Sequence, residues 1–256
     1  MNLYWLEQTD ADVPADNNWL SPNEAARLNA MRFPRRRAVW RLGRWTGKRA
    51  LSVCLEVPAD PLAFKRIEIS PAPSGAPEVF FDNHPAALTI SLSHRDGIAA
   101  CAVAMSRVEM GCDVEKVEPR SSVFVEDYFT LEEKALLAHA SEADHFRLLA
   151  LLWSGKESAL KALREGLRLD TRSVIAIPCA VSFDCDGWSQ LRVRHLGDRH
   201  TGDRSRPDYV FHGWWQYADN FVRTVVAAPP PTAPILLQIP SYVPDTPSLC
   251  GSRSEE

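Results

Sequence analysis

The sequence predicts an α+β protein whose two halves follow the same order of elements. In each half, a helix-start signal opens a helical stretch, and strand-like runs come after it. The two starts are Ser21-Pro22-Asn23-Glu24 and Thr130-Leu131-Glu132-Glu133, each with a hydroxyl that can cap the helix and a Glu three residues later. Helices followed by strands are typical of α+β folds, and their repetition suggests an internal duplication, although no repeat of the sequence itself is clear.

The first half is expected to be helical from about residue 23 to residue 53, with an interruption near Pro34. Residues 60–87 are rich in proline and hold short strand-like runs. Residues 88–93 alternate apolar and polar side chains, and residues 98–105 form a continuous apolar run typical of a buried strand. Strands are therefore expected at 67–69, 79–81, 88–93, 98–105 and 110–114.

The second half begins with a helix that reaches about residue 140. A longer helix covers about 143–165 and ends at Gly166, a residue type that suits a helix C-terminus. Strands are then expected at 174–183, 191–195, 209–215 and 221–227. The charged residues 197–207 favour a loop, and the seven prolines of residues 229–256 favour a mostly disordered tail.

The composition is that of an ordinary globular protein. The 256 residues are 45% hydrophobic and 24% charged, and the net charge of −4 argues against a general nucleic-acid binder. The first residues lack the basic and apolar regions of a signal peptide, and the apolar runs are too short to span a bilayer. The six cysteines form no CxxC pair, so we expect reduced thiols. From these observations together, we expect a cytoplasmic protein without membrane or nucleic-acid partners.

The strongest local motif is Gly111-Cys112-Asp113-Val114-Glu115. Side chains of a strand alternate between its two faces, so Asp113 and Glu115 should lie on the same face. Neighbouring carboxylates raise each other's pKa unless a cation lies between them, and oxygen ligands of this kind suit Mg²⁺. Alone, the pattern is common, and an exposed strand face or a turn is the simpler explanation.

A second motif lies on the long helix of the second half. Trp153, Glu157 and Lys161 are spaced by four residues, so they should share one helix face, with Lys156 at its border. A surface ion pair between Glu157 and Lys161 is the ordinary explanation, but the apolar turns before it predict a largely buried helix. Gly155 in mid-helix costs about 1 kcal/mol relative to alanine, which indicates close approach by another group.

Two further segments carry groups that suit phosphate. Ser91-Leu92-Ser93-His94 ends an alternating strand, where His94 taken alone is more often a surface residue. A helical face of the first half carries regularly spaced cations: Arg37, Arg41, Arg44 and Lys48. Arginine suits bidentate phosphate binding, while a solvated face or RNA binding are alternatives. The sequence holds no recognised nucleic-acid motif to support RNA binding.

Taken in order, these four segments resemble the surfactin-type enzymes of the 4′-phosphopantetheinyl transferase superfamily. Members of that family carry a basic helix, a Ser-His segment, a G-x-D-x-E strand and a W-x-x-K-E-x-x-x-K helix. Each segment is weak evidence alone, but four in the same order and at suitable spacings are specific. The resemblance covers roughly residues 20–227 and leaves out the tail.

The resemblance implies two similar α+β subdomains related by a pseudo-twofold axis, each a small antiparallel sheet packed with helices. We place them at residues 1–109 and 110–228, followed by the tail at 229–256. Coenzyme A would be the donor substrate, bound in the cleft between them, and Mg²⁺ the cofactor. By resemblance, the metal ligands are Asp113, Glu115 and Glu157, and the donor-binding residues are Arg44, Lys48, Ser93, His94, Lys156 and Lys161.

The implied reaction moves the 4′-phosphopantetheine arm of coenzyme A to a serine of an apo acyl or peptidyl carrier protein and releases 3′,5′-ADP. Glu157 is the expected base for the serine proton, and Lys161 would stabilise or protonate the departing ADP. Many relatives have a basic residue in a Gly-Lys-Pro turn. Gly75-Ala76-Pro77 stands here instead, so one contact to the donor's 3′-phosphate is expected to be missing.

Two other functions were weighed. A non-catalytic coenzyme A or nucleotide-binding protein would not need Asp113, Glu115, Glu157 and Lys161 together. A metal-dependent phosphodiesterase would be expected to use more histidine ligands than this chain offers. Fatty-acid, polyketide and non-ribosomal peptide carriers all remain open as acceptors, and a pseudo-dimeric chain favours a monomer.

Overall fold

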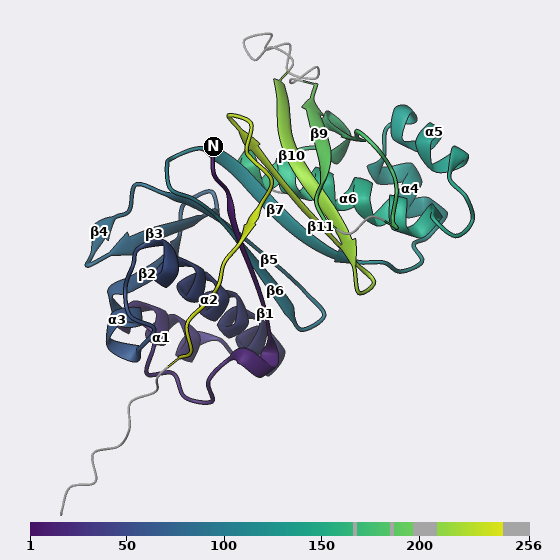
Figure 1. Ribbon diagram of the computed structural model, residues 1–256. Coiled ribbons are helices and arrows are strands. Elements are labelled where there is room, and N and C mark those ends of the chain that lie inside the picture. Colours follow the sequence, from purple (N-terminus) through teal and green to yellow (C-terminus); the bar gives the residue numbers. More distant parts are fainter. Residues whose placement is uncertain (166–167, 185–186, 197–208, 243–256) are drawn as a thin grey trace, which may run out of the picture.

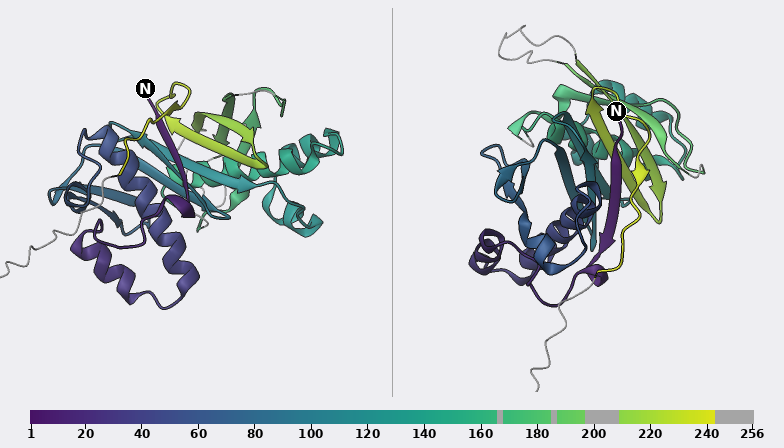
Figure 2. Two further views of the ribbon diagram at one scale, coloured as in Figure 1. Left: turned by 60° about the horizontal axis from the view of Figure 1, so that its bottom comes forward. Right: turned by 60° about the vertical axis from the view of Figure 1, so that its left-hand side comes forward.

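The computed structural model describes residues 1–165, 168–184, 187–196 and 209–242. Gly166, the expected loop at 197–207 and the end of the expected tail from residue 243 lie outside these residues. Within them, the mixed α+β architecture is as expected. Figure 1 shows two helix-and-sheet layers joined where β5 and β7 lie side by side, and Figure 2 shows that α2 and α6 each cover one sheet.

The first half contains one long helix against a four-stranded sheet of order β12-β1-β6-β5. A small sheet of order β2-β3-β4 lies beside it. Its elements are β1 (Tyr4–Thr9), a 3₁₀ turn (Asp10–Asp12), α1 (Pro22–Ala30), α2 (Pro34–Cys54), α3 (Pro61–Arg66), β2 (Ile67–Pro71), β3 (Pro77–Phe81), β4 (His84–Pro85), β5 (Thr89–Arg95) and β6 (Ile98–Ala104). The helix break at Pro34 is confirmed, whereas β1 and α3 were not expected.

The second half places one long helix against a five-stranded antiparallel sheet of order β7-β11-β10-β9-β8. Its elements are β7 (Glu109–Lys116), α4 (Ser122–Tyr128), α5 (Leu131–His139), α6 (His145–Ala162), a 3₁₀ turn (Thr171–Ser173), β8 (Val174–Pro178), β9 (Ser189–His195), β10 (Tyr209–Ala218) and β11 (Phe221–Ala228), and β12 (Ile235–Leu236) returns to the first half. All four expected strands of this half are present, and α4 is additional.

A buried Lys–Glu pair organises the first half. The ammonium of Lys48 lies 2.5 Å from Glu24 Oε2, with side-chain exposures of 0% and 2%. Lys48 also donates to the carbonyl oxygens of Trp19 and Phe64 at 3.1 and 2.8 Å. Glu24 Oε1 accepts from the backbone N–H of Ile69 at 3.0 Å, so the helix-capping glutamate also ties α1 to β2.

The second half repeats this arrangement. Lys156 Nζ lies 2.7 Å from Glu133 Oε2, and both side chains are 0% exposed. Lys156 donates to the carbonyl oxygens of Thr171 and Val174 at 2.9 and 2.6 Å. Glu133 Oε1 accepts from the backbone N–H of Ala176 at 2.9 Å. Each capping box therefore provides the carboxylate that neutralises the buried lysine of its own half.

The two pairs reveal a repeat that the sequence analysis does not identify. Trp45-Thr46-Gly47-Lys48 on α2 matches Trp153-Ser154-Gly155-Lys156 on α6. A Cβ on Gly47 would lie 2.7 Å from Ile69 Cδ1, and one on Gly155 would lie 3.1 Å from Ala176 Cβ. The close approach expected at Gly155 is thus confirmed, and the approaching group is the protein's own sheet. These equivalences support an internal duplication; the domain boundary at residue 109 stays a prediction.

The two sheets meet along β5 and β7. The hydroxyl of Ser91 accepts from the backbone N–H of Cys112 at 2.9 Å, and that of Ser93 accepts from Val114 at 3.2 Å. Serine hydroxyls at alternate positions of β5 therefore replace the carbonyl acceptors that a neighbouring strand would offer. This explains why the strand before His94 alternates apolar residues with Thr and Ser.

The expectation of a disordered tail is wrong for residues 229–242. β12 pairs in parallel with β1, and Leu237 and Ile239 pack against the core under α2. Tyr242 stacks edge-to-face on Trp45, with ring centroids 4.8 Å apart, and it also contacts Phe64. The proline-rich composition of this segment predicted that it has little apolar surface to pack. The few apolar side chains that it has nevertheless pack against the first half.

In the part of the chain that the structure describes, no helix combines the length and the apolar character needed to cross a bilayer.

We predict that Lys156→Met will destabilise the fold by about 3–5 kcal/mol, because it leaves the Glu133 charge buried without its partner. Thermal or urea unfolding monitored by circular dichroism measures this loss. Glu133→Gln/Lys156→Met should recover part of it, since no uncompensated charge remains. Lys134→Met provides the control, because Lys134 pairs with Glu126 at the surface and should cost less than about 1 kcal/mol. Equal losses for Lys156→Met and Lys134→Met would contradict the structural role of the buried pair.

Candidate active site

The site residues predicted from the two strongest motifs meet where β7 crosses α6. At the crossing, a Cβ on Gly111 would lie 1.9 Å from the Ser158 carbonyl oxygen and 2.7 Å from the Ala162 nitrogen. Glycine is therefore required for β7 to approach the helix this closely. The approach places Asp113, from the strand, beside Lys161, from the last turn of α6.

One carboxylate oxygen of Asp113 is hydrogen-bonded, and the other has no partner among the described residues. Its Oδ1 accepts from the hydroxyl of Ser93 and from the ammonium of Lys161, both at 2.8 Å. Its Oδ2 is buried and has no hydrogen-bond partner among the described residues. Because a buried carboxylate oxygen without a partner is costly, this oxygen is suited to a cation from solution.

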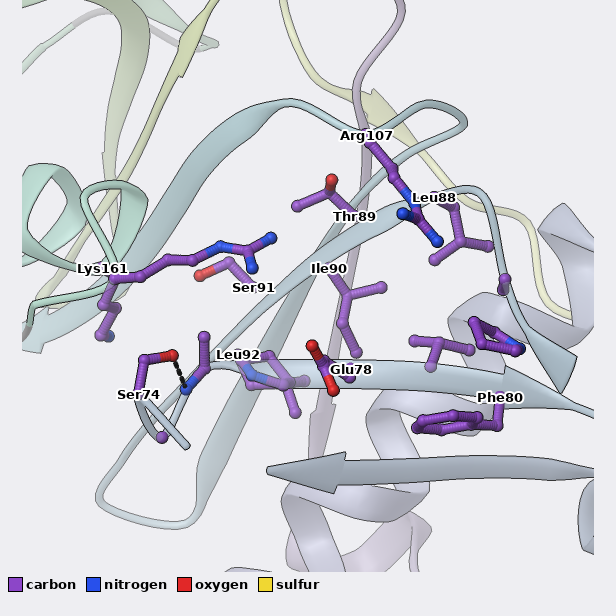
Figure 3. A pocket seen from close by; sticks show the side chains of 17 residues that line it. Ser74, Glu78, Phe80, Leu88, Thr89, Ile90, Ser91, Leu92, Arg107 and Lys161 are labelled. Carbon is purple, nitrogen blue, oxygen red and sulfur yellow. Dashed lines mark hydrogen bonds between the residues drawn. The ribbon is translucent and has the colours of Figure 1, made fainter. Parts of the chain in front are cut away.

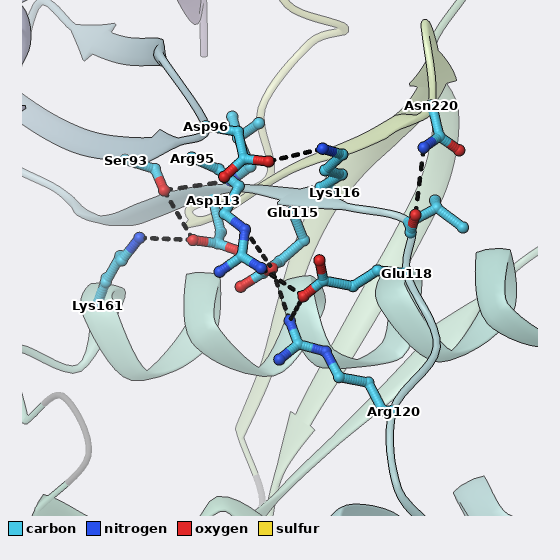
Figure 4. Close-up of polar contacts among 12 residues, drawn as sticks. Ser93, Arg95, Asp96, Asp113, Glu115, Lys116, Glu118, Arg120, Lys161 and Asn220 are labelled. Carbon is cyan, nitrogen blue, oxygen red and sulfur yellow. Dashed lines mark hydrogen bonds and ion pairs between the residues drawn. The ribbon is translucent and has the colours of Figure 1, made fainter.

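Glu115 lies on the same strand but is directed toward two arginines. Its Oε2 lies 3.3 Å from Arg120 and 3.9 Å from Arg95. Figure 4 shows that the Asp113 carboxylate faces Lys161 and Ser93, whereas the Glu115 carboxylate faces Arg95 and Arg120. Burial and then the Asp113 charge raise the pKa of Glu115 to about 7, against the opposing effect of the two arginines.

Glu157 and Lys161 lie on one face of α6 with Trp153, as their spacing predicted. These three are the half-buried side chains of a helix whose central turns are otherwise buried. Burial and then Asp113 raise the pKa of Glu157, while Lys161 lowers it. Burial lowers and Asp113 raises the pKa of Lys161, and the net shift is upward. The three carboxylates therefore act electrostatically on one another.

The donor set of this cluster consists of hard oxygen ligands. Among the described residues, no three His, Cys, Asp or Glu side chains form a group that could hold a metal ion. The unsatisfied Asp113 Oδ2 and the raised pKa values of Glu115 and Glu157 nevertheless fit a divalent cation, which would relieve the repulsion among the carboxylates. The side chains are thus suited to Mg²⁺ but are not arranged around it.

A hollow of about 650 Å³ opens beside this cluster, between β3, β5 and the end of α6. Lys161 and Arg164 line the part near α6, and Arg107 lines it from the β6–β7 connection (Figure 3). Side chains of β3 and β5 form the wall between these cations, and they include the Glu78 carboxylate as well as apolar groups. Arg168 donates to the Ser74 carbonyl at 2.9 Å, which links the segment after α6 to the turn at Gly75.

A second hollow of about 320 Å³ contains the other predicted residues. Arg44 and His94 line it together with Arg36, and it shares the wall formed by Pro77 with the larger hollow. The guanidinium of Arg44 lies 5.0 Å from the Trp40 ring centroid, and its Nε has no hydrogen-bond partner among the described residues. Desolvation and then Lys161 lower the pKa of His94.

The structure corrects the expected roles of several cations and of Ser93. Lys48 and Lys156 cannot contact the donor, because both ammonium groups are buried in the Lys–Glu pairs of the fold. On the basic face, Arg37 donates to the Leu28 carbonyl in the last turn of α1, and Arg41 donates to the Asp16 carbonyl in the loop before α1. The hydroxyl of Ser93 is bonded to Asp113 and to the β7 backbone, so it positions the carboxylate.

Four arginines near the site were missed: Arg95, Arg107, Arg120 and Arg164. Arg95 directly follows the Ser-His segment, and Arg120 follows Glu115 by five residues, so their proximity in sequence was the available signal. Arg107 and Arg164 stand at the ends of β6 and α6, where no periodicity marks them. Basic residues are common near the ends of helices and strands, so the sequence does not single out these two arginines. Only the packing of the two halves brings Arg107 and Arg164 to the same hollow.

Comparison with known proteins agrees with this geometry. A sequence model of the 4′-phosphopantetheinyl transferase superfamily matches residues 109–213, which include β7 and α6. The 4′-phosphopantetheinyl transferase gsp of Aneurinibacillus migulanus is 26% identical over 132 residues. This similarity spans 52% of the chain and 51% of that relative, so it covers about half the length of each.

The match includes the crossing of β7 and α6, with Asp113 and Glu115 on the strand and Glu157 and Lys161 on the helix. The resemblance found in the sequence is therefore supported for this region: residues 109–213 match the sequence model of the 4′-phosphopantetheinyl transferase superfamily.

Proposed function

We propose that this protein transfers the 4′-phosphopantetheine arm of coenzyme A to a serine of an apo acyl or peptidyl carrier protein, with 3′,5′-ADP as the second product. One observation carries the proposal. The crossing of β7 and α6, which lies within the region that matches the superfamily, gathers Asp113 and Lys161. Beside them is a hollow large enough for much of a nucleotide-sized donor, lined mostly by residues of the first half.

The two hollows support a division of the donor between them. The larger one would hold the pyrophosphate near Lys161 and Arg164, where two cations line its wall. The smaller one would take the 3′-phosphate, because Arg44 and His94 both line it. Arg44 Nε lies 4.0 Å from Glu24 Oε1 but has no hydrogen-bond partner among the described residues. Ala76, which lines the larger hollow, offers no charge to either phosphate.

Mg²⁺ is the proposed cofactor, with Asp113, Glu115 and Glu157 as its ligands. The buried, unsatisfied Asp113 Oδ2 supports this assignment. When bound, the ion would neutralise charge on the pyrophosphate and polarise it for attack. Burial first, and then the neighbouring carboxylates, raise the pKa of Glu115 and of Glu157, and the ion would counter the part that comes from repulsion.

The remaining steps follow from the side chains. The acceptor serine hydroxyl attacks the phosphorus that carries pantetheine, and the bond from that phosphorus to 3′,5′-ADP breaks. Glu157 is the proposed base for the serine proton, because it is a half-buried carboxylate on the same face of α6 as Lys161. Lys161, whose pKa is raised, stays charged and stabilises the departing phosphate. Orientation and electrostatics would supply most of the acceleration.

The proposed acceptor is a carrier protein, and its pathway is open. Carriers of fatty-acid, polyketide or non-ribosomal peptide synthesis would all present the required serine. A cytoplasmic monomer without nucleic-acid or membrane partners stays the expectation for this chain.

The reaction itself is the first test. Apo carrier proteins incubated with the protein, coenzyme A and Mg²⁺ should gain the mass of one phosphopantetheine arm, as measured by intact-protein mass spectrometry. Omitting coenzyme A or adding EDTA should abolish the gain. Coenzyme A binding without any modified carrier would favour a non-catalytic binding protein, and hydrolysis of coenzyme A without a carrier would favour a phosphodiesterase.

The carboxylates provide a second prediction. Asp113→Asn and Glu157→Gln should each lower kcat by roughly a hundredfold or more, because they remove a metal ligand or the base. Steady-state kinetics with one carrier protein measures this. Glu132→Gln is the control, since Glu132 pairs with Arg194 at the surface away from the crossing. Turnover within threefold of the parent for either site variant would exclude that residue from the proposed mechanism.

Donor recognition is tested through Arg44. A charge-assisted hydrogen bond contributes about 1.5–3 kcal/mol, so Arg44→Ala should raise the KM for coenzyme A by roughly ten- to a hundredfold. Arg35→Ala removes the same charge from an exposed position of α2 and should leave KM unchanged. Ala76 lies between Gly75 and Pro77, which line both hollows, so a lysine there could reach the smaller one. Ala76→Lys should therefore widen the preference for coenzyme A over dephospho-coenzyme A. An unchanged donor ratio would mean that residue 76 does not lie near the 3′-phosphate.

A further inference from the structure

The two carboxylates of β7 have different partners. Asp113 is bonded to Ser93 and Lys161 on one side. Glu115, two residues along the strand, is paired with Arg120 and lies near Arg95 on the other. Strand geometry places both side chains on one face, yet Figure 4 shows their carboxylates directed toward different partners. In this arrangement the described His, Cys, Asp and Glu side chains form no group able to hold a metal ion.

Arg120 is itself held in place. Its guanidinium lies 3.2 Å from Glu118 Oε1, which also accepts from Arg95. The same guanidinium lies 5.3 Å from the centroid of the Phe124 ring on α4. Arg120 is 28% exposed and Glu115 is 13% exposed, so the pair is more than a transient surface contact. Two acidic partners and a ring therefore fix the arginine that holds Glu115.

We propose that Arg120 is a positioning residue that keeps the Glu115 carboxylate in an ion pair, so that a divalent cation can bind all its ligands only after the Glu115–Arg120 pair opens. The inference rests on the proposed metal site. Metal affinity is then set by a competition between the cation and Arg120 for one carboxylate. Because partly exposed ion pairs are weak, the competition should cost the metal about fivefold in affinity. Such a pair keeps Glu115 neutralised without the metal and still opens when the metal arrives.

Binding of Mn²⁺ to the full chain tests this, measured by electron paramagnetic resonance of the free ion without coenzyme A or carrier protein. Arg120→Gln should lower the Mn²⁺ dissociation constant about fivefold. Removal of any nearby positive charge also strengthens cation binding, so a matched control is required. Lys116→Gln supplies it, because Lys116 is next to Glu115 on β7 but pairs with Asp96. Its effect should be smaller than that of Arg120→Gln.

A double-mutant cycle separates the pair from general electrostatics. In a Glu115→Gln background, the effect of Arg120→Gln should shrink to that of Lys116→Gln, because no carboxylate remains to be released. Circular dichroism of each variant checks that the fold is retained. Equal effects of Arg120→Gln and Lys116→Gln in the parent background would overturn the proposal.

Weaker Mn²⁺ binding in Arg120→Gln would also overturn it, since Arg120 would then hold Glu115 in the ligating position. Absence of Mn²⁺ binding in every variant would overturn both this inference and the proposed metal site. The expected affinity pattern without modification of any carrier protein would leave this inference standing and overturn the transfer reaction. The two proposals can therefore fail separately.

Discussion

The close crossing of β7 and α6 is the constraint on which the rest of the site depends. A side chain at residue 111 would overlap the Ser158 carbonyl of the helix, so glycine there lets the strand lie directly on α6. On the other side of β7, the hydroxyls of Ser91 and Ser93 satisfy the strand's backbone and join the second sheet. The strand is thus fixed between the two halves, and Asp113 is brought to the ammonium of Lys161 without any flexible loop. Sites on rigid elements hold their geometry more accurately than sites on loops.

The internal duplication explains why the molecule has one such site. Both long helices carry a Trp-Thr/Ser-Gly-Lys segment whose lysine is buried against the capping glutamate of its own half. The residue after that lysine is Glu157 in the second half and Arg49 in the first. Arg49 is buried and donates to the Pro240 carbonyl of the C-terminal segment. The same helical segment therefore carries the half-buried Glu157 in the second half. In the first half it carries Arg49, which binds the C-terminal segment.

Much of the fold followed from local signals. The capping boxes, the break at Pro34 and the alternation before His94 predicted the helix starts and most of the strands, because these signals act between residues close in the chain. The stripe of Trp153, Glu157 and Lys161 was likewise predictable from helical spacing. β1, α3 and α4 were missed, and the returning segment at 229–242 was taken for a disordered tail. It is held by contacts with β1 and α2, which lie near the other end of the chain.

The sequence by itself determined the order of elements and the residue types gathered at the site. Only the tertiary structure decided what each charge does. Lys48 and Lys156 read as donor-binding cations, yet each is enclosed with a glutamate because burial without a partner would be prohibitive. Arg120 carries no motif, yet it faces Glu115 across the turn after β7. Local spacing reports which face of an element a side chain occupies, whereas its charge partner and its access to solvent depend on what another part of the chain packs against that face.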